Sequence, residues 1–229
     1  MPEGDQSQKK KKNGGGFQAM GLSEEVYRGI VKMGFRTPTP VQRKSLPVVL
    51  SGCDTVCMAR TGSGKTAAFC IPLLERMLSS QRRKQQSSTH NTNFSAGAVI
   101  LSPTRELSLQ TLKVLQTLSG FISEPSLNCI GINGGESMEK QFALLSSNPD
   151  VIVATPGRLA HHLAEIPDFH LKHCDLVVFD EADRLFEMGE FGKTIVVAFL
   201  MHGIFVFIHS EISLQKYADL TTFFPFAHA

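Results

Sequence analysis

Residues 59–66 read Ala-Arg-Thr-Gly-Ser-Gly-Lys-Thr, and the organisation of the whole chain follows from them. The apolar run Thr55–Met58 precedes them and a helix-like stretch begins near Lys65, which is the strand, glycine-rich loop and helix order of a phosphate-binding loop. Glycines let several backbone N–H groups point at one anion, and the helix N-terminus adds the positive end of its dipole. Ala59 stands where the general pattern has its first glycine. The stretch predicts a nucleotide site, against the alternative of an ordinary strand–helix turn.

Two acidic residues later in the chain supply the counterpart of this loop. Lys65 offers a point charge to the terminal phosphates, and the Thr66 hydroxyl is placed to hold Mg²⁺. Apolar Leu176–Phe179 then runs into Asp180 and Glu181. We expect Asp180 to bind Mg²⁺ through water and Glu181 to orient or deprotonate the attacking water. Such a turn can also be a plain helix start, since Asp caps helices well, but the order of the two motifs favours Mg-nucleotide binding.

Length and composition set limits on the fold and its partners. The 229 residues could form one large α/β domain or two small ones, and 42% hydrophobic with 19% charged residues fits a globular core. The net charge of +2 is too small to indicate a nucleic-acid partner by itself. The cysteines have no C-x-x-C spacing, and Cys57, Cys70 and Cys129 lie in apolar runs, which favours buried free thiols in a reducing compartment over a zinc site. No secretory signal is expected, because the N-terminus has no apolar core.

Short apolar runs alternate with helical patterns along the chain. One helix is expected from a cap at Ser23 to about Gly34, and another from about Lys65 to Leu78, with Pro72 as a kink or early end. Such alternation predicts a mostly parallel sheet with helices on both faces, and right-handed crossovers bring the polar turns to one edge. The expected strands are Thr55–Met58, Ala98–Leu101, 128–132, Val151–Ala154 and Leu176–Phe179, and further helices should follow the turns at 103–107 and 155–158.

Two polar segments interrupt this pattern. Residues 1–16 contain Lys9-Lys10-Lys11-Lys12 and Gly14-Gly15-Gly16 and cannot bury enough surface to fold, so we expect a disordered basic tail. The lysines fit either a nuclear-localisation or RNA-contacting patch or a plain solvated tail. Residues 79–95 are polar and of low complexity, which predicts an exposed, disordered loop.

Arginines occur in two of the polar turns. Arg105 and Arg158 each lie beside an expected helix start, where helix N-termini and hydroxyls can hold nucleic-acid phosphates without reading sequence. Either turn alone is more often an ordinary connection. The histidines at 161, 162, 170 and 173 do not predict a metal site, because the adjacent pair cannot share a helical face.

Six motifs, in order, resemble those of the DEAD-box ATP-dependent RNA helicases. The similarity covers about residues 14–189 and explains Ala59, which is usual at the first position of this family's loop. It implies a P-loop NTPase of RecA-like fold that couples ATP binding and hydrolysis to RNA remodelling, with ATP and Mg²⁺ as cofactors. The stretch also resembles the subgroup involved in nucleolar large-ribosomal-subunit assembly. The motifs are Gly34–Gln42, Ala59–Thr66, Pro103–Leu107, Gly134-Gly135, Thr155–Arg158 and Asp180–Asp183.

The resemblance also implies roles for individual residues. Gln42 would read the adenine, Phe17 would stack near it, and Asp183 would couple the site to motion. The remaining ATP-binding residues would be Ala59, Arg60, Thr61, Gly62, Ser63, Gly64, Lys65 and Thr66, with Lys65, Asp180 and Glu181 catalytic and Thr66 and Asp180 on Mg²⁺. The RNA backbone would be held by Pro103, Thr104, Arg105, Gly134, Gly135, Thr155, Pro156, Gly157 and Arg158. The implied partners are RNA and pre-ribosomal proteins, for a monomer in the nucleus and its nucleolus, with the cytoplasm as an alternative.

The sequence departs from the family after Glu190. The family's first domain continues with a helix, a strand and a Ser-Ala-Thr motif, and a second RecA-like domain brings arginines to the ATP site, but residues 191–229 match none of this. Apolar Ile195–Ile208 is interrupted by His202-Gly203 and is shorter than the roughly 20 residues of a membrane helix, so no membrane is expected. As a hairpin it would be apolar on both faces.

The chain is therefore expected to divide into a basic tail (1–16), a Q-motif region (17–43), an incomplete RecA-like domain (44–190) and an apolar tail of unknown fold (191–229). Our hypothesis for the last segment is a truncated or alternatively spliced product or an erroneous gene model. The 229 residues alone would then bind ATP weakly, barely hydrolyse it and not unwind duplexes, since arginine fingers contribute about 10³–10⁵ in turnover. The alternative function is a non-catalytic RNA- or partner-binding module that competes with the full-length helicase. A metabolic P-loop kinase would leave the Gln42 and Arg158 turns unused.

Overall fold

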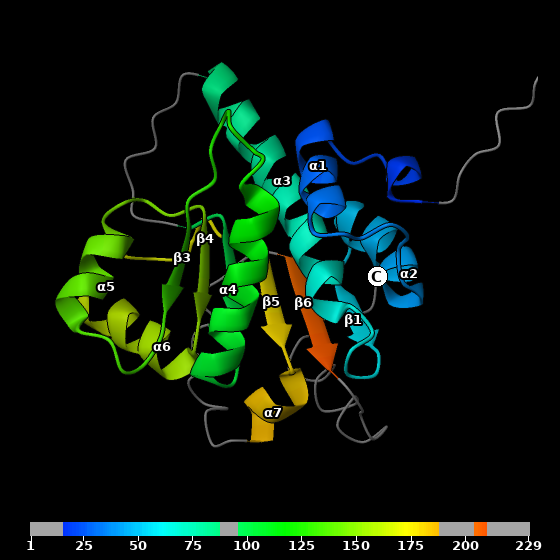
Figure 1. Cartoon of the computed structure of the whole chain (residues 1–229). Coiled ribbons are helices and arrows are strands. Elements are labelled where there is room, and N and C mark those ends of the chain that lie inside the picture. Colours follow the sequence, from blue (N-terminus) through cyan, green and yellow to red (C-terminus); the bar gives the residue numbers. More distant parts are fainter. Residues whose placement is uncertain (1–15, 88–95, 188–203, 210–229) are drawn as a thin grey trace, which may run out of the picture.

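Every strand expected from the sequence forms, and all of them pair in parallel. The computed structural model describes residues 16–87, 96–187 and 204–209, and within these the six strands lie in the order β1-β6-β5-β2-β4-β3 (Figure 1). The strands are β1 (Thr55–Met58), β2 (Ala98–Leu101), β3 (Cys129–Ile132), β4 (Val151–Ala154), β5 (Leu176–Asp180) and β6 (Ile204–His209). The expected α/β class, with a parallel sheet, is confirmed.

Helices cover both faces of the sheet because its strands are apolar on both sides. Along β2, Ala98 and Ile100 pack into one apolar cluster, whereas Val99 and Leu101 pack into another on the opposite face. The first face is covered by η1 (Phe17–Met20), α1 (Glu24–Lys32), α2 (Pro40–Leu50), α3 (Lys65–Ser87) and α4 (Arg105–Ser119). The second face is covered by α5 (Met138–Leu145), α6 (Pro156–Glu165) and α7 (Ala182–Glu187).

Helix α3 is longer than the sequence pattern predicts. We expected it to end near Leu78 and a polar loop to follow over 79–95, but the helix continues to Ser87. Pro72 does not end it, because the residues on both sides of the proline are fully buried and their burial outweighs the roughly 3 kcal/mol that an internal proline costs. The part of the expected loop that lies at 88–95 is outside the described residues.

Contacts with the rest of the domain hold the last turns of α3. The side-chain amide of Gln81 bonds the Asp150 carboxylate, which also accepts from the backbone N–H of Asn128 at 2.8 Å. Arg82 Nη2 lies 2.6 Å from Glu25 Oε1 on α1. These tertiary contacts, together with residues that favour helices, explain why a polar stretch is helical rather than an open loop.

The sequence pattern missed helices α2 and α5. No helix was expected over Pro40–Leu50, but Pro40 opens α2, where a missing N–H costs nothing. The Thr39 hydroxyl accepts from the Gln42 N–H at 3.4 Å and the Thr39 N–H donates to Gln42 Oε1 at 3.0 Å, which is a capping box. Helix α5 is capped in a simpler way, by the hydroxyl of Ser137.

Ser23 has the position of an N-cap for α1, as expected, but its side chain makes a different bond. Its backbone N–H and its hydroxyl both donate to Glu75 Oε2, each at 2.9 Å. One carboxylate on α3 therefore holds the start of α1 against the first face of the sheet.

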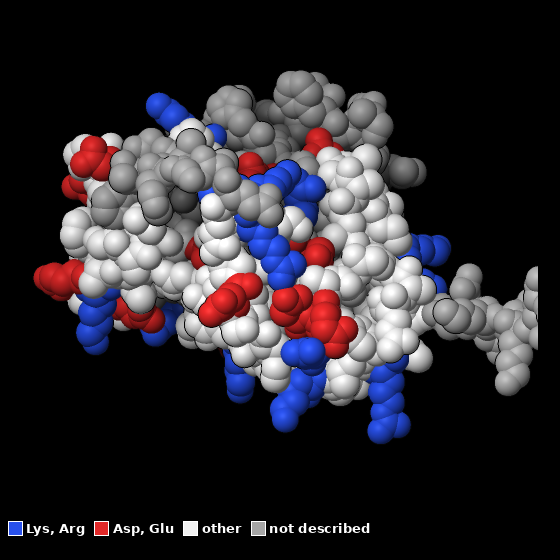
Figure 2. All heavy atoms as spheres, turned by 90° about the horizontal axis from the view of Figure 1, so that it is seen from above, with Lys and Arg blue, Asp and Glu red and all other residues white. Residues whose placement is uncertain are grey.

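The view from above shows the edge of the molecule at which the strands begin (Figure 2). Lys and Arg side chains are intermingled there with Asp and Glu side chains, and the described part of this face carries no track of one sign. A basic surface of one sign is what non-specific binding to nucleic acid requires. The functional site is therefore expected at the opposite edge, where the strands end.

Strand β6 comes from the apolar segment for which no fold was predicted. It lies between β1 and β5 and pairs in parallel with both, with Val206 opposite Thr55 and Val178. Both edges of Ile204–His209 are used by strands from the body of the domain. Residues 1–15, 191–203 and 210–229 lie outside the described residues. Among the helices that are described, none combines the length and the apolar character that crossing a membrane requires.

Four of the five cysteines are buried free thiols. Cys57, Cys70 and Cys129 are buried as expected, Cys174 is buried as well, and Cys53 is exposed. Burial raises the pKa of Cys129 and of Cys174 to about 12, so both remain protonated at neutral pH. These thiols therefore act as small apolar groups of the core.

Candidate nucleotide and nucleic-acid site

The polar turns that follow the strands lie at one edge of the sheet. The register places Met58 opposite His209, Asp180 opposite Ile208, and both Leu101 and Ile132 opposite Ala154. Because the pairs are parallel, the loops after these residues leave the sheet on the same side, at the lower edge in Figure 1. Only β6 separates β1 from β5 among the described strands, so the loop after β1 and the turn after β5 begin roughly 10 Å apart. The convergence expected from the sequence is confirmed.

Loop 59–66 has the curled backbone that anion binding needs. Gly62 and Gly64 have φ angles of +78° and +90°, in the left-handed region that favours glycine. Helix α3 begins at Lys65, so its first N–H groups, which have no partner within the helix, lie at this loop. The Lys65 ammonium donates to the carbonyl oxygen of Ala59 at 2.5 Å. Of the other residues expected to bind ATP here, Arg60 and Thr61 are exposed, and Ser63 and Thr66 are partly buried.

Gln42 contacts the same loop from α2. Its side chain is 3% exposed; Oε1 accepts from the Thr39 N–H and Nε2 donates to the Gly64 carbonyl at 3.0 Å. A Cβ at Gly64 would lie 2.6 Å from this Nε2, so the close approach requires glycine. The amide retains one N–H and one lone pair, and its expected contact with adenine stays a prediction.

Phe17 lies in the apolar cluster of the first face. Its side chain is 2% exposed. A base could stack on the ring only if η1 shifted, so the stacking expected from the resemblance also stays a prediction.

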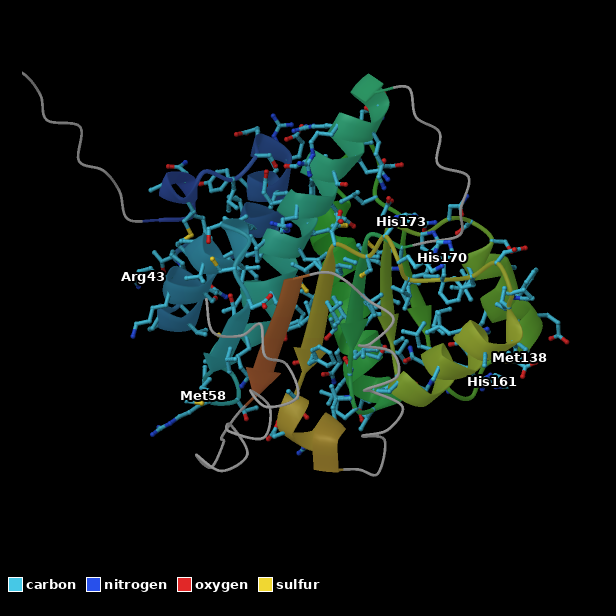
Figure 3. The ribbon with its side chains drawn as sticks, turned by 180° about the vertical axis from the view of Figure 1, so that it is seen from behind. Arg43, Met58, Met138, His161, His170 and His173 are labelled. Atoms are coloured by element: carbon cyan, nitrogen blue, oxygen red, sulfur yellow. The ribbon has the colours of Figure 1, made fainter. Side chains whose placement is uncertain are left out.

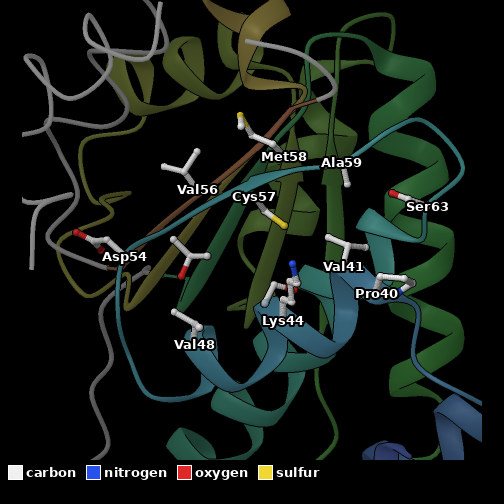
Figure 4. A pocket seen from close by; sticks show the side chains of 12 residues that line it. Pro40, Val41, Lys44, Val48, Asp54, Val56, Cys57, Met58, Ala59 and Ser63 are labelled. Carbon is white, nitrogen blue, oxygen red and sulfur yellow. The ribbon is translucent and has the colours of Figure 1, made fainter. Parts of the chain in front are cut away.

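A pocket of about 580 Å³ opens beside the loop, between α2 and β1 (Figure 4). Val41, Lys44 and Val48 of α2 line one side of it, and Cys57 and Met58 of β1 line the other. Among the described strands β1 pairs only with β6, so this pocket borders the other edge of β1. Burial raises the pKa of the Cys57 thiol, which makes it a neutral lining group.

The carboxylate of Asp180 is buried where charge is costly. Its side chain is 7% exposed, and burial raises its pKa to about 6. The charge of Glu181 adds to the rise, whereas the Lys65 ammonium and a hydrogen bond from the Thr111 hydroxyl oppose it. A buried carboxylate whose charge is only partly balanced fits a divalent cation, and oxygen donors are those that Mg²⁺ prefers. The donor set therefore fits the expected Mg²⁺.

Glu181 and Asp183 begin the turn into α7. Glu181 has a φ of +49°, which is uncommon for a residue with a side chain. Arg184 Nη1 lies 3.0 Å from Glu181 Oε2. Asp183 Oδ1 is buried and has no hydrogen-bond partner among the described residues. Both acids thus keep acceptor capacity at the edge where the strands end.

Two of the turns expected to bind RNA contact each other. The Thr104 hydroxyl caps α4, and Arg105 opens that helix with its side chain 49% exposed. Arg105 Nη2 lies 3.6 Å from Glu136 Oε1. Gly135 has a φ of +87°, and a Cβ there would lie 2.6 Å from Arg105 Nη1. The glycine therefore allows the guanidinium to lie across the turn that follows β3.

The third turn opens helix α6. Pro156 is its first residue, and the hydroxyl of Thr155 makes no capping bond. The Arg158 guanidinium lies against the sulfur of Met138, the first residue of α5. Figure 3 shows Met138 and His161 near each other at the end of the molecule that α5 and α6 form.

The polar residues that connect these turns were not predicted. The residues that belong to no motif in the sequence, and that only their tertiary contacts mark, are Thr111, Glu136, Gln141 and His162.

His170 and His173 stack edge to face with ring centroids 5.6 Å apart, but they lie away from the carboxyl ends of the strands (Figure 3). No group of three metal-binding side chains occurs among the described residues.

Comparison with known proteins identifies the family. A family model described as DEAD/DEAH box helicase matches residues 39–201. The chain belongs to this helicase family. Its fold, with a parallel sheet and motif-bearing turns at one edge, agrees with the RecA-like domain that the resemblance implied.

Several curated helicases are about half identical to the chain. It is 52% identical over 187 residues to DEAD-box ATP-dependent RNA helicase 29 of Oryza sativa subsp. indica, covering 82% of this chain and 20% of that protein. It is 54% identical over 181 residues to the ATP-dependent RNA helicase DDX54 of Mus musculus, covering 79% and 19%. It is 50% identical over 193 residues to the ATP-dependent RNA helicase dbp10 of Aspergillus clavatus, covering 84% and 19%. The chain thus spans about a fifth of the length of these relatives.

Proposed function

We propose that the chain binds Mg-ATP at loop 59–66 and RNA at the neighbouring turns, as the ATP-binding part of an ATP-dependent RNA helicase. One observation carries the proposal: parallel strands deliver the loop, the Asp180–Glu181 pair and three arginine- or glycine-bearing turns to a single edge. A site of this kind can couple ATP binding and hydrolysis to the binding of an RNA backbone. The names of the relatives, all ATP-dependent RNA helicases, support it.

In the nucleotide site, each residue has a task that its chemistry allows. Lys65 exchanges the Ala59 carbonyl for the terminal phosphates, and the loop amides hold the other phosphate oxygens. Thr66 and Asp180, the latter through water, would hold Mg²⁺, which would neutralise charge on the phosphates. Glu181 orients the attacking water and receives its proton.

At the RNA site, the turns at 103–105, 134–135 and 155–158 contact the sugar-phosphate backbone, so binding is independent of sequence and sensitive to salt. Asp183 couples the two sites through α7. Because the chain resembles these relatives and the nucleolar subgroup, we assign it to RNA remodelling during large-ribosomal-subunit assembly. It would act as a monomer in the nucleolus, with RNA and pre-ribosomal proteins as partners.

ATP binding and hydrolysis by the purified 229-residue chain test the nucleotide site. Lys65→Ala should abolish binding of a fluorescent ATP analogue, and Lys32→Ala, an exposed lysine at the end of α1, is the matched control. Glu181→Gln should keep ATP binding and remove hydrolysis. Loss of binding in Glu181→Gln would show that this acid is structural. Unchanged binding in Lys65→Ala would overturn the proposed site.

Fluorescence anisotropy with a labelled single-stranded RNA tests the second site. Arg158→Ala should weaken binding and reduce its dependence on salt, because one phosphate contact is lost. Turnover should be low with and without RNA for a polypeptide limited to these residues. A non-catalytic role would be favoured if Lys65→Ala kept full function in cells, since ATP binding would then be dispensable.

A further inference from the structure

Three polar residues form a buried hydrogen-bonded network between two of the turns proposed to bind RNA. The exposed fractions are 1% for Asn133, 0% for Gln141 and 0% for His162. Gln141 Nε2 donates to the main-chain carbonyl of Asn133 at 2.5 Å, and Gln141 Oε1 lies 2.7 Å from His162 Nε2. Residues 133, 141 and 162 come from the end of β3, from α5 and from α6.

The bonding pattern fixes the direction of each hydrogen bond. Because a carbonyl only accepts, the Gln141 group that faces Asn133 is the NH₂ group, and the oxygen faces His162. His162 therefore donates from Nε2. Its Nδ1 is buried without a partner among the described residues, as is the side-chain oxygen of Asn133.

This hydrogen-bonded network lies between the two turns that are proposed to bind phosphates. Asn133 directly precedes Gly134-Gly135, and His162 lies one helical turn after Arg158, on the same face of α6. Arg158 also contacts Met138 at the start of α5. Gln141 thus joins the turn after β3 to the helix that carries Arg158.

Stability alone does not account for these polar residues. A buried polar group without a partner costs about 1–3 kcal/mol, and apolar residues of the same shape would avoid that cost. A hydrogen-bonded chain, unlike apolar packing, fixes the relative position of the groups it joins. Binding of a phosphate backbone at two turns depends on such fixed geometry.

We propose that Gln141 and His162 are positioning residues for RNA: they hold the Gly134–Gly135 turn and Arg158 at the spacing of successive phosphates on one strand. This inference rests on the proposed function. Neither side chain touches the RNA. Their effect is to let both turns bind the same strand without reorganisation.

Leucine and glutamine at position 162 separate positioning from packing. His162→Leu removes the donor to Gln141, whereas His162→Gln keeps a donor in the same place. His161→Leu changes the exposed neighbour in the same way and is the matched control. Gln141→Leu removes the whole connection. For each variant we would measure affinity for a labelled single-stranded oligouridylate over a salt series, affinity for a fluorescent ATP analogue, and the thermal unfolding midpoint.

His162→Leu and Gln141→Leu should lower RNA affinity by about tenfold, as expected for one contact to a charged group. The salt slope should fall by about 0.7, since one phosphate of a single strand is released. ATP affinity should stay unchanged, and His162→Gln and His161→Leu should bind RNA like the unaltered chain. The double variant Gln141→Leu, His162→Leu should lose no more RNA affinity than either single variant, because both remove the same connection.

Two results would overturn the inference while leaving the proposed function intact. One is RNA affinity in His162→Leu equal to that of His162→Gln. The other is a loss of RNA affinity that accompanies equal losses of ATP affinity and thermal stability, because that pattern indicates packing alone. If Gln141→Leu fails to fold, the comparison of the two His162 variants decides. Absence of RNA binding by the unaltered chain would overturn the proposed function itself, and this inference with it.

Discussion

The side-chain amide of Gln42 donates to the main-chain carbonyl of Gly64 at 3.0 Å, which joins helix α2 to the nucleotide loop. The other end of the same amide accepts from the Thr39 N–H, so the group that caps α2 also fixes the loop. Any change in this amide should therefore alter nucleotide binding even if no ligand atom touches it.

Gln42→Glu tests this relationship. The substitution keeps an acceptor for Thr39 but places an oxygen against the Gly64 carbonyl. We expect ATP affinity to fall about tenfold and the free energy of unfolding to fall by about 1–3 kcal/mol, measured by nucleotide titration and urea unfolding. Gln85→Glu, the same charge change at the exposed end of α3, should leave both unchanged. Unaltered ATP affinity in Gln42→Glu would show that the amide does not support the loop.

Alanine at the two loop glycines should have unequal costs. Both have positive φ, but a Cβ at Gly62 would meet nothing within 4 Å, whereas a Cβ at Gly64 would lie 2.6 Å from Gln42 Nε2. Gly62→Ala should therefore cost only about 1 kcal/mol of backbone strain. Gly64→Ala should cost clearly more, because Gln42 must leave its position. Chemical unfolding of both variants measures the difference, and equal losses would contradict it.

The sequence was sufficient for strands β1 to β5 and for the edge where the motifs meet, because apolar runs that alternate with helical patterns are local signals. It was insufficient where tertiary contacts decide. The polar end of α3 is helical because Gln81 and Arg82 find partners on other elements. Strand β6 forms between two strands that are distant in sequence. Gln42 was assigned to a base edge, and its bond to Gly64 could be recognised only in three dimensions.

Glu75 should contribute much more to stability than Glu24. Glu75 accepts two hydrogen bonds from Ser23, whereas Glu24 forms an exposed pair with Arg28. Glu75→Gln should lower the free energy of unfolding by about 1–3 kcal/mol and increase hydrogen exchange in α1. Glu24→Gln, with the same loss of charge, should change it by less than about 0.5 kcal/mol. Equal effects would show that the Ser23 contact is not important for α1.

Asp180→Asn should trade function for stability. Because burial raises the pKa of Asp180 to about 6, its ionised form at pH 7.5 is held at a cost on the order of 2–3 kcal/mol. Asparagine has the same shape and removes that cost, so without Mg²⁺ the variant should unfold at a higher temperature. Its affinity for Mg-ATP should fall strongly, since the cation loses a charged ligand. A lower unfolding temperature without Mg²⁺ would indicate that the carboxylate has partners that balance its charge.

His162 should make the domain less stable in mild acid. Burial lowers the pKa of this imidazole below its ordinary 6.5, and the charges of Arg158 and His161 add to the shift. Glu139 of α5 and Glu165 of α6 line a surface pocket together with His162. Even with these two carboxylates nearby, the pKa of His162 is lowered. Below pH 6.5 the unfolded chain therefore binds a proton that the folded chain does not, so the free energy of unfolding falls as the pH falls.

Urea unfolding between pH 5 and pH 8 measures this effect. His162→Gln removes the titrating group but keeps a donor for Gln141, so its stability should fall less from about pH 6.5 downward than that of the unaltered chain. Above about pH 7 the two curves should run parallel, because the imidazole is neutral in both states. His161→Gln removes an exposed histidine and should keep the steep fall. Parallel curves for the unaltered chain and His162→Gln down to pH 5 would show that His162 takes up its proton in the folded state as readily as in the unfolded one, and that Gln141 and its neighbours accommodate the charge.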